Sequence, residues 1–146
     1  MSEAALPLPQ LSTLDARTQA FIKLTAAQID RTRPYGKVRP VGVGDVLFEV
    51  GDTRIPMFVL LSGEMEIVQP HCEGERFVAK HEPGEFTGET TMISGRRALV
   101  RGRITKAGEV LEISPENLRS LIAKDAELSE IFMRAFILRR LALVAT

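Results

Sequence analysis

Gly88, Glu89, Arg96 and Arg97 bring a glycine, a carboxylate and two guanidinium groups together in one short segment. Glu89 could accept hydrogen bonds from a sugar hydroxyl, and an arginine could bind a phosphate through its planar, always-charged fork. Gly88 permits close backbone approach, and a helical turn after it would direct free N–H groups at the same anion. The segment therefore fits a small ligand that carries a sugar and a phosphate. A surface salt bridge beside a tight turn would explain the same residues, so the surrounding elements must decide.

The chain has the size and composition of one compact domain, with 146 residues of which 45% are hydrophobic. Basic and acidic residues number 19 each, and the resulting net charge of zero argues against a nucleic-acid-binding protein. Cys72 is the only cysteine, which excludes an intrachain disulfide and a cysteine-rich metal site and favours the reducing cytosol. No apolar run reaches the roughly 18 residues of a membrane-spanning helix, and the N-terminus lacks a signal-peptide pattern. We therefore expect a cytoplasmic protein that contacts neither nucleic acid nor a membrane through this chain.

Residues 1–36 are predicted to form a loose lead-in followed by N-terminal helices. The helical pattern runs from Asp15 to Arg33 and ends at residues 34–36, which read Pro-Tyr-Gly. Thr25 and Gln28 have the spacing of a capping box, which places a break between two short helices at this point.

Residues 37–114 have a different sequence pattern, with short runs of Val, Ile, Leu and Phe between turn residues. Short strands at such spacing are typical of an antiparallel barrel or jelly roll. The turn signals lie at residues 42–45, 51–52, 62–63, 70–74, 83–84 and 106–108. We interpret the Gly-Asp and Ser-Gly pairs among them as structural turns without a direct ligand role.

Residues 115–146 are predicted to form two C-terminal helices. Ser114 has the position of an N-cap with Pro115 after it, and Asp125 can cap a second, longer helix. The apolar stripe of this second helix is wider than one core contact requires, since it comprises Leu128, Ile131, Phe132, Ala135, Leu138 and Ala142 together with Phe136, Ile137, Leu141 and Val144. We expect the 125–146 helix to contact a second copy of the chain or a downstream domain. Because the helical pattern continues to Thr146 without a Gly or Pro stop, we also expect the chain to be part of a longer protein.

Five segments, in this order along the chain, resemble the cyclic-nucleotide-binding domain of the catabolite-activator and cAMP-dependent-kinase regulatory-subunit superfamily. They are a Gly-Asp turn and strand at 44–48, a second Gly-Asp at 51–52, a strand ending in Leu-Ser-Gly at 58–63, a hairpin return at 64–68, and a segment similar to the phosphate-binding cassette at 86–98. The resemblance extends from Val38 to Leu141. It implies a mainly β fold with flanking helices: an antiparallel jelly-roll β-barrel, or double-stranded β-helix, with N-terminal helices before it and two C-terminal helices after it.

The resemblance also implies roles for individual residues of the 86–98 segment. Glu89 would hold the ribose 2′-hydroxyl, while Gly88 and the N–H groups of Thr90 and Thr91 would line the phosphate. Alignment of the following strand makes Arg96 the phosphate-binding arginine. Arg97 and Ala98 then occupy the two positions after it, where the family usually has small residues.

Three features of this segment depart from the family pattern. The stretch between Glu89 and Arg96 is shorter than usual, and the proline before the arginine is missing, so the approach of Arg96 is less fixed. Thr90 and Thr91 replace an apolar residue and a small residue. Arg97 could add a second phosphate contact or could hinder the ligand.

The function implied by the resemblance is that of a regulatory sensor domain for a cyclic nucleotide. Family members that prefer cGMP often have a threonine directly after the phosphate-binding arginine; Arg97 stands there, so cAMP is the expected ligand rather than cGMP. Binding would be transmitted through the C-terminal helices to an attached effector. We identify no catalytic constellation, no metal site and no resident cofactor, and therefore expect that this chain is not an enzyme.

Several alternatives remain open. The barrel could bind no nucleotide and serve as an interaction or dimerisation module of a larger protein, either a transcription regulator or an enzyme similar to the bacterial proteins that continue into a thioredoxin-reductase-like domain. Some members of the superfamily bind haem, for which this chain offers only His71 and His81. His71 and Cys72 are expected at the surface of a polar turn. The Arg139-Arg140 pair could stack on a purine, or could lie on a solvated or acid-paired surface of a helix that packs elsewhere.

Overall fold

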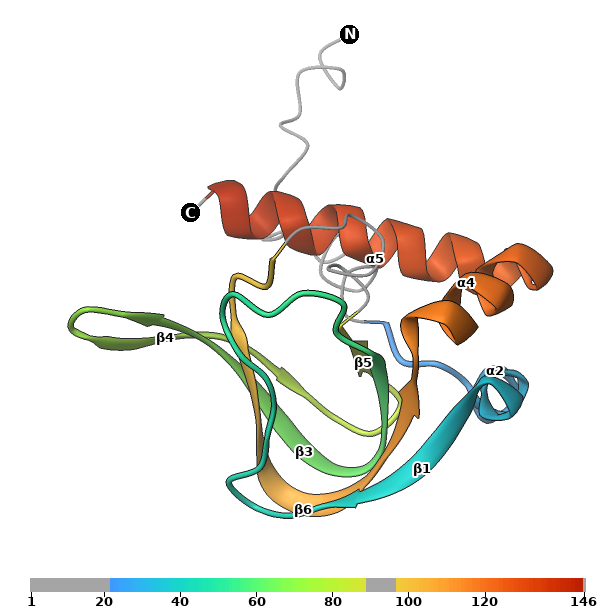
Figure 1. Cartoon of the computed structure of the whole chain (residues 1–146), viewed down its shortest axis with the longest axis horizontal. Helices are drawn as coiled ribbons and strands as arrows, with labels where there is room; N and C mark the ends of the chain where they lie inside the picture. The colour runs from blue at the N-terminus through green and yellow to red at the C-terminus, as the bar shows by residue number, and fades with distance from the viewer. Residues whose placement is uncertain (1–21, 89–96, 146) are drawn as a thin grey trace, which may run out of the picture.

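The described part of the computed structural model comprises residues 22–88 and 97–145. An N-terminal α2 (Ala26–Thr32) and a 3₁₀ turn, η2 (Arg33–Tyr35), precede the strands. The strands are β1 (Gly36–Val41), β2 (Val46–Phe48), β3 (Met57–His71), β4 (Gly74–His81), β5 (Phe86–Thr87) and β6 (Arg101–Ile113). Two helices, α4 (Pro115–Lys124) and α5 (Ala126–Ala145), complete the described chain (Figure 1).

All strand pairs in the sheet are antiparallel. The order is β1-β6-β3-β4, with β2 also paired to β6 and β5 to β3. Figure 1 shows that β3 and β6 curve strongly, so that the sheet wraps into a roll, and that α5 lies across the open side of this roll. The predicted fold is confirmed: a mainly antiparallel β-structure with an N-terminal helix and two C-terminal helices.

Two of the predicted turns are wrong, because residues 62–63 and 106–108 lie inside the long strands β3 and β6. The register between these strands shifts around Ser62 and Glu64. Gly63 has a φ of +92°, and a Cβ on it would lie 2.6 Å from the carbonyl oxygen of Lys106. A Cβ on Gly108 would lie 2.1 Å from the carbonyl oxygen of Ser62. The glycines therefore allow the two strand backbones to pass closely where both strands bend.

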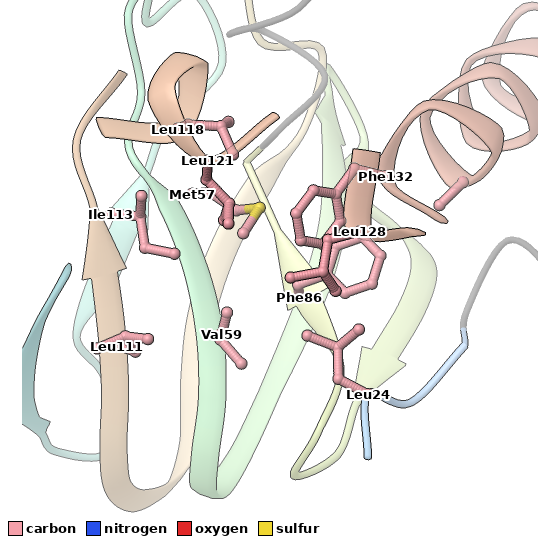
Figure 2. Close-up of a cluster of buried hydrophobic side chains, with 11 residues drawn as sticks. Leu24, Met57, Val59, Phe86, Leu111, Ile113, Leu118, Leu121, Leu128 and Phe132 are labelled. Atoms are coloured by element: carbon pink, nitrogen blue, oxygen red, sulfur yellow. The ribbon is translucent and has the colours of Figure 1, made fainter. Parts of the chain in front are cut away.

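The first four residues of β3, 57–60, are buried on both faces of the sheet, and they alternate between two cores. Met57 and Val59 belong to the cluster beneath the helices, which we term the helix-side core (Figure 2). Phe58 and Leu60 belong to the cluster inside the roll, the roll core. A continuous apolar run in this strand thus fills both sides of the sheet.

The predicted helix starts are confirmed in the structure. Thr25 and Gln28 form both hydrogen bonds of a capping box, Thr25 Oγ1 accepting at 3.1 Å and Gln28 Oε1 accepting at 2.9 Å. Ser114 accepts a hydrogen bond from the Asn117 N–H at 3.2 Å. Asp125 accepts one from the Leu128 N–H at 3.0 Å and so caps α5. The predicted helix before Thr25 falls mostly outside the described residues, and residues 22–25 are not helical.

The helix α5 buries one apolar face and leaves other apolar side chains in solvent. Leu128, Phe132 and Ala135 are fully buried in the helix-side core. Met133 and Ile137, one turn apart, remain 37% and 49% exposed. No helix in the described part of the chain has both the length and the hydropathy to cross a membrane.

Candidate functional site

The structure describes three of the predicted ligand-binding residues: Gly88, Arg97 and Ala98. The other four, Glu89, Thr90, Thr91 and Arg96, lie outside the described residues. The structure therefore describes the two ends of the 86–98 segment, residues 86–88 and 97–98, and the elements that hold them.

The first end of the segment is fixed against the connection between β2 and β3. Thr87 pairs with Phe58 of β3, and Gly88 follows with a φ of +97°. A Cβ on Gly88 would lie 2.3 Å from the carbonyl oxygen of Pro56. Both the backbone conformation and this contact require glycine at this position.

The second end is held by the same β2–β3 connection. Ala98 is buried in the roll core, its N–H donates to the Asp52 carbonyl oxygen at 2.9 Å, and its own carbonyl accepts from the Gly51 N–H at 2.9 Å. Asp52 is held in turn by its carboxylate, which accepts from the Glu49 N–H at 2.9 Å. The Gly51-Asp52 pair is thus a structural turn, as predicted, and it anchors the end of the segment.

Arg97 is exposed, whereas the arginines of the strand that follows are engaged in ion pairs. Arg101 binds Glu49 at 2.6 Å and Glu75 at 2.8 Å. Arg103 binds Glu66 at 2.7 Å and Glu75 at 2.9 Å. Arg97 is therefore more accessible to solvent than the two arginines of β6 that follow it.

On the helix side, Phe86 is held by two residues of α5. Its ring meets that of Phe132 edge to face, with centroids 5.0 Å apart. The guanidinium of Arg139 lies 4.8 Å above the Phe86 ring, and Arg139 Nη1 donates to the Phe86 carbonyl oxygen at 2.9 Å. Cation–π contact and a charge-assisted hydrogen bond thus join α5 to the residue that begins the segment.

A buried polar pair lies directly before Phe86. The carboxylate of Glu85 and Nδ1 of His81 are 2.8 Å apart, and both side chains are almost completely buried. Burial lowers the pKa of His81; Glu85 opposes this shift and the positive charge of Arg139 adds to it. The two side chains thus share one buried hydrogen bond, in which the role of Nδ1 is set by the His81 tautomer.

The surroundings of Arg139 and His81 were missed by sequence reasoning. Arg139 lies half-buried against Phe86, so a solvated helix surface does not describe its position, while the purine contact stays a prediction. A signal was available, because Arg139 follows Phe132 by seven residues and so continues the buried face of α5. His81 and Glu85 flank a Pro-Gly turn, and nothing in that pattern indicates burial. His71 and Cys72 are exposed, as predicted.

Within the described ranges, no group of three or more His, Cys, Asp or Glu side chains could hold a metal ion.

Known protein families include one that this chain matches. The family model of the cyclic nucleotide-binding domain matches residues 38–125, more than half of the chain. The chain belongs to this family. The match includes both ends of the 86–98 segment and extends to Asp125, the cap of α5.

The curated relative that matches this chain has low sequence identity to it. A Rhodopseudomonas palustris protein that carries the name of a potassium channel protein is 25% identical over 115 residues, which are 78% of this chain and 27% of that protein. The chain thus spans about a quarter of the length of this curated relative.

Solved structures share the fold of this domain. The Thermus thermophilus catabolite activator protein has a TM-score of 0.70 at 24% identity, over 87% of this chain and 60% of that chain. The EAL enzyme Bd1971 has been solved in a cAMP-bound form (TM-score 0.60, over 75% of this chain and 29% of that chain) and a cGMP-bound form (0.61, 73% and 28%), each at 16% identity.

Proposed function

We propose that this domain is a cytosolic sensor that binds a cyclic nucleotide, cAMP in preference to cGMP, and transmits binding to an attached effector. In this role it is not itself an enzyme. The observation that carries the proposal is how the two ends of the 86–98 segment are attached to the rest of the domain. Gly88 and Ala98 are both tied to the β2–β3 connection, while Phe86 is tied to α5. A ligand held by such a segment would act on the roll and on the helix together.

Within the segment, the proposed roles follow the family pattern. Glu89 accepts from the ribose hydroxyl, Arg96 binds the cyclic phosphate, and the N–H groups after Gly88 line the same phosphate. Arg97, which is exposed, supplies a second and weaker attraction for the anion. Ligand binding then shifts the population of arrangements of α4 and α5 relative to the roll.

The preference for cAMP rests on Arg97, which occupies the position where members that prefer cGMP often have a threonine. The similar EAL enzyme has been crystallised with each of the two nucleotides, so this fold accommodates both. Isothermal titration with cAMP and cGMP tests the choice: tighter binding of cAMP is expected, and tighter binding of cGMP would reverse it.

Arginine variants test the assignment within the segment. Arg96→Ala should abolish heat from cAMP, because it removes the fork that binds the phosphate. Arg97→Ala should weaken binding only slightly and serves as the matched control, since it removes the neighbouring positive charge. The opposite order would show that the alignment of the two arginines is wrong.

A second candidate function is supported by the exposed apolar side chains of α5. Met133 and Ile137 lie one turn apart and are exposed, a pattern that fits contact with a second copy or with a downstream domain. In this alternative the domain binds no nucleotide and serves as the interaction module of a transcription regulator or of an enzyme such as a thioredoxin-reductase-like protein. Light scattering of the wild-type chain and of Ile137→Glu, with and without cAMP, separates the two functions: a dimer that Ile137→Glu disrupts, in a chain without nucleotide binding, favours the module.

A further inference from the structure

The hairpin formed by β3 and β4 projects beyond the rest of the sheet (Figure 1). Strand β6 begins at Arg101, opposite Val68, so among the described strands residues 69–71 and 74–76 pair only with each other. The register between β3 and β4 shifts just before Val68, where this free end leaves the sheet. We term residues 69–76 the hairpin arm. Because a two-stranded hairpin is marginally stable on its own in water, the arm needs a further attachment.

The carboxylate of Glu75 supplies this attachment by reaching across β3 to two arginines of β6. It accepts from Arg101 Nη1 at 2.8 Å, and it accepts from both Nη1 and Nη2 of Arg103, at 3.0 Å and 2.9 Å. The contact with Arg103 thus uses the planar fork of the guanidinium. Arg103 and Arg101 hold the pKa of the Glu75 carboxyl below its ordinary value, so Glu75 is charged at neutral pH. We term these three residues the latch.

Both arginines of the latch also pair with a carboxylate outside the arm. Arg101 binds Glu49 at 2.6 Å, and Arg103 binds Glu66 at 2.7 Å. Each guanidinium therefore keeps an acidic partner when Glu75 moves away. The side chains of the latch are 28–34% exposed, so salt reaches these ion pairs and weakens their attraction.

The closed arm lies beside an apolar side chain on the outer face of the sheet. Val68 shares this face with Glu66, two positions before it, and belongs to neither the helix-side core nor the roll core. It is nevertheless only 2% exposed. Its cross-strand neighbours are Arg101 and Phe77, and the Phe77 ring, which follows the arm directly along β4, is 59% exposed. Movement of the arm and Phe77 away from the sheet would therefore uncover Val68.

We propose that the latch holds the hairpin arm closed at low ionic strength and releases it at high ionic strength, uncovering Val68. The fold thus contains a salt-controlled apolar surface at the edge of its sheet. This device is separate from the 86–98 segment, and its test requires no nucleotide.

Amide hydrogen exchange of residues 69–76 tests the latch at about 0.1 M and about 1 M NaCl, where the Debye length is about 10 Å and about 3 Å. In wild-type protein we expect roughly fivefold faster exchange of the arm at the higher salt, the factor that corresponds to about 1 kcal/mol. Glu75→Gln keeps the size of the side chain and removes its charge, so its arm should exchange at the faster rate at both salt concentrations. Glu73→Gln is the matched control: Glu73 is exposed in the turn of the same hairpin, has no ion pair among the described residues, and its variant should behave as wild type.

The amides of residues 110–113 in β6 report on global opening, because these residues pair with β1 and β3 in the buried part of the sheet. Their exchange should be the same in Glu75→Gln and Glu73→Gln. Equal exchange of the arm in these two variants, or an arm that exchanges in wild type at the rate of an unstructured peptide at low salt, would overturn the latch. Acceleration of residues 110–113 by the same factor as the arm would overturn it too, because the opening would then be global.

Binding of the apolar dye ANS at low salt tests whether release uncovers Val68. Glu75→Gln should bind more dye than Glu73→Gln, and the added substitution Val68→Ser should remove the difference. Equal dye binding by Glu75→Gln and Glu73→Gln would overturn the uncovering of Val68.

Discussion

Gly88→Ala perturbs the candidate site through two separable effects. The first is the backbone: at a φ of +97°, an L-residue with a Cβ is strained, at a cost of about 1–2 kcal/mol. The second is steric: the new Cβ would lie 2.3 Å from the carbonyl oxygen of Pro56, and the approach of a methyl group to fixed backbone costs about 1–3 kcal/mol more. We therefore expect Gly88→Ala to lower the free energy of unfolding by about 2–5 kcal/mol.

Gly44→Ala isolates the first effect. Gly44 has a φ of +93°, close to that of Gly88, but nothing lies within 4 Å of its added Cβ. Urea unfolding of both variants and of wild type gives the two free-energy changes, and their difference is the cost of the Pro56 contact. Cyclic AMP binding should weaken in Gly88→Ala and not in Gly44→Ala. If Gly88→Ala lowered the free energy of unfolding by no more than Gly44→Ala does, the close contact between Gly88 and the Pro56 carbonyl oxygen would be refuted.

Two further predictions concern groups around the site. Because burial holds the pKa of His81 below its ordinary value of 6.5, the unfolded chain takes up that proton first on acidification, and stability should fall as the pH drops below 6.5. His81→Asn, whose amide can still donate to Glu85, should flatten this part of a thermal-midpoint profile; an identical profile would contradict the assignment. Arg31 donates to the Asp125 carboxylate at 2.8 Å, so Arg31→Ala should loosen the cap of α5 and lower the thermal midpoint more than Arg33→Ala, which removes a pair within one exposed turn. Equal midpoints for these two variants would argue against that link.

Much of the fold was predictable because its signals are local. The capping box at Thr25 and the caps at Ser114 and Asp125 depend on residues three positions apart, and all three form as predicted. The Gly63 and Gly108 signals were interpreted as turns because a glycine in a strand pattern does not reveal its partner. Their role, two strands bending past each other, depends on a contact between residues far apart in sequence.

In the candidate site, too, local features were predictable and contacts between distant residues were not. The structural character of the Gly51-Asp52 turn followed from residue types alone, whereas the contact with Pro56 that requires glycine at position 88 did not. The contact of Arg139 with Phe86 joins positions separated by most of the C-terminal half, and only the continued face of α5 hinted at it. Burial of His81 could not be predicted, because this residue ends β4 next to residues 82–85, which are polar or turn-forming in sequence.

A crystal structure of the chain grown with saturating cAMP tests the central claim most directly. The account predicts nucleotide with its cyclic phosphate against the 86–98 segment, between Gly88 and Arg97, and with Arg139 still donating to the Phe86 carbonyl oxygen. An empty segment at saturating nucleotide, or cAMP bound elsewhere on the molecule, would contradict it.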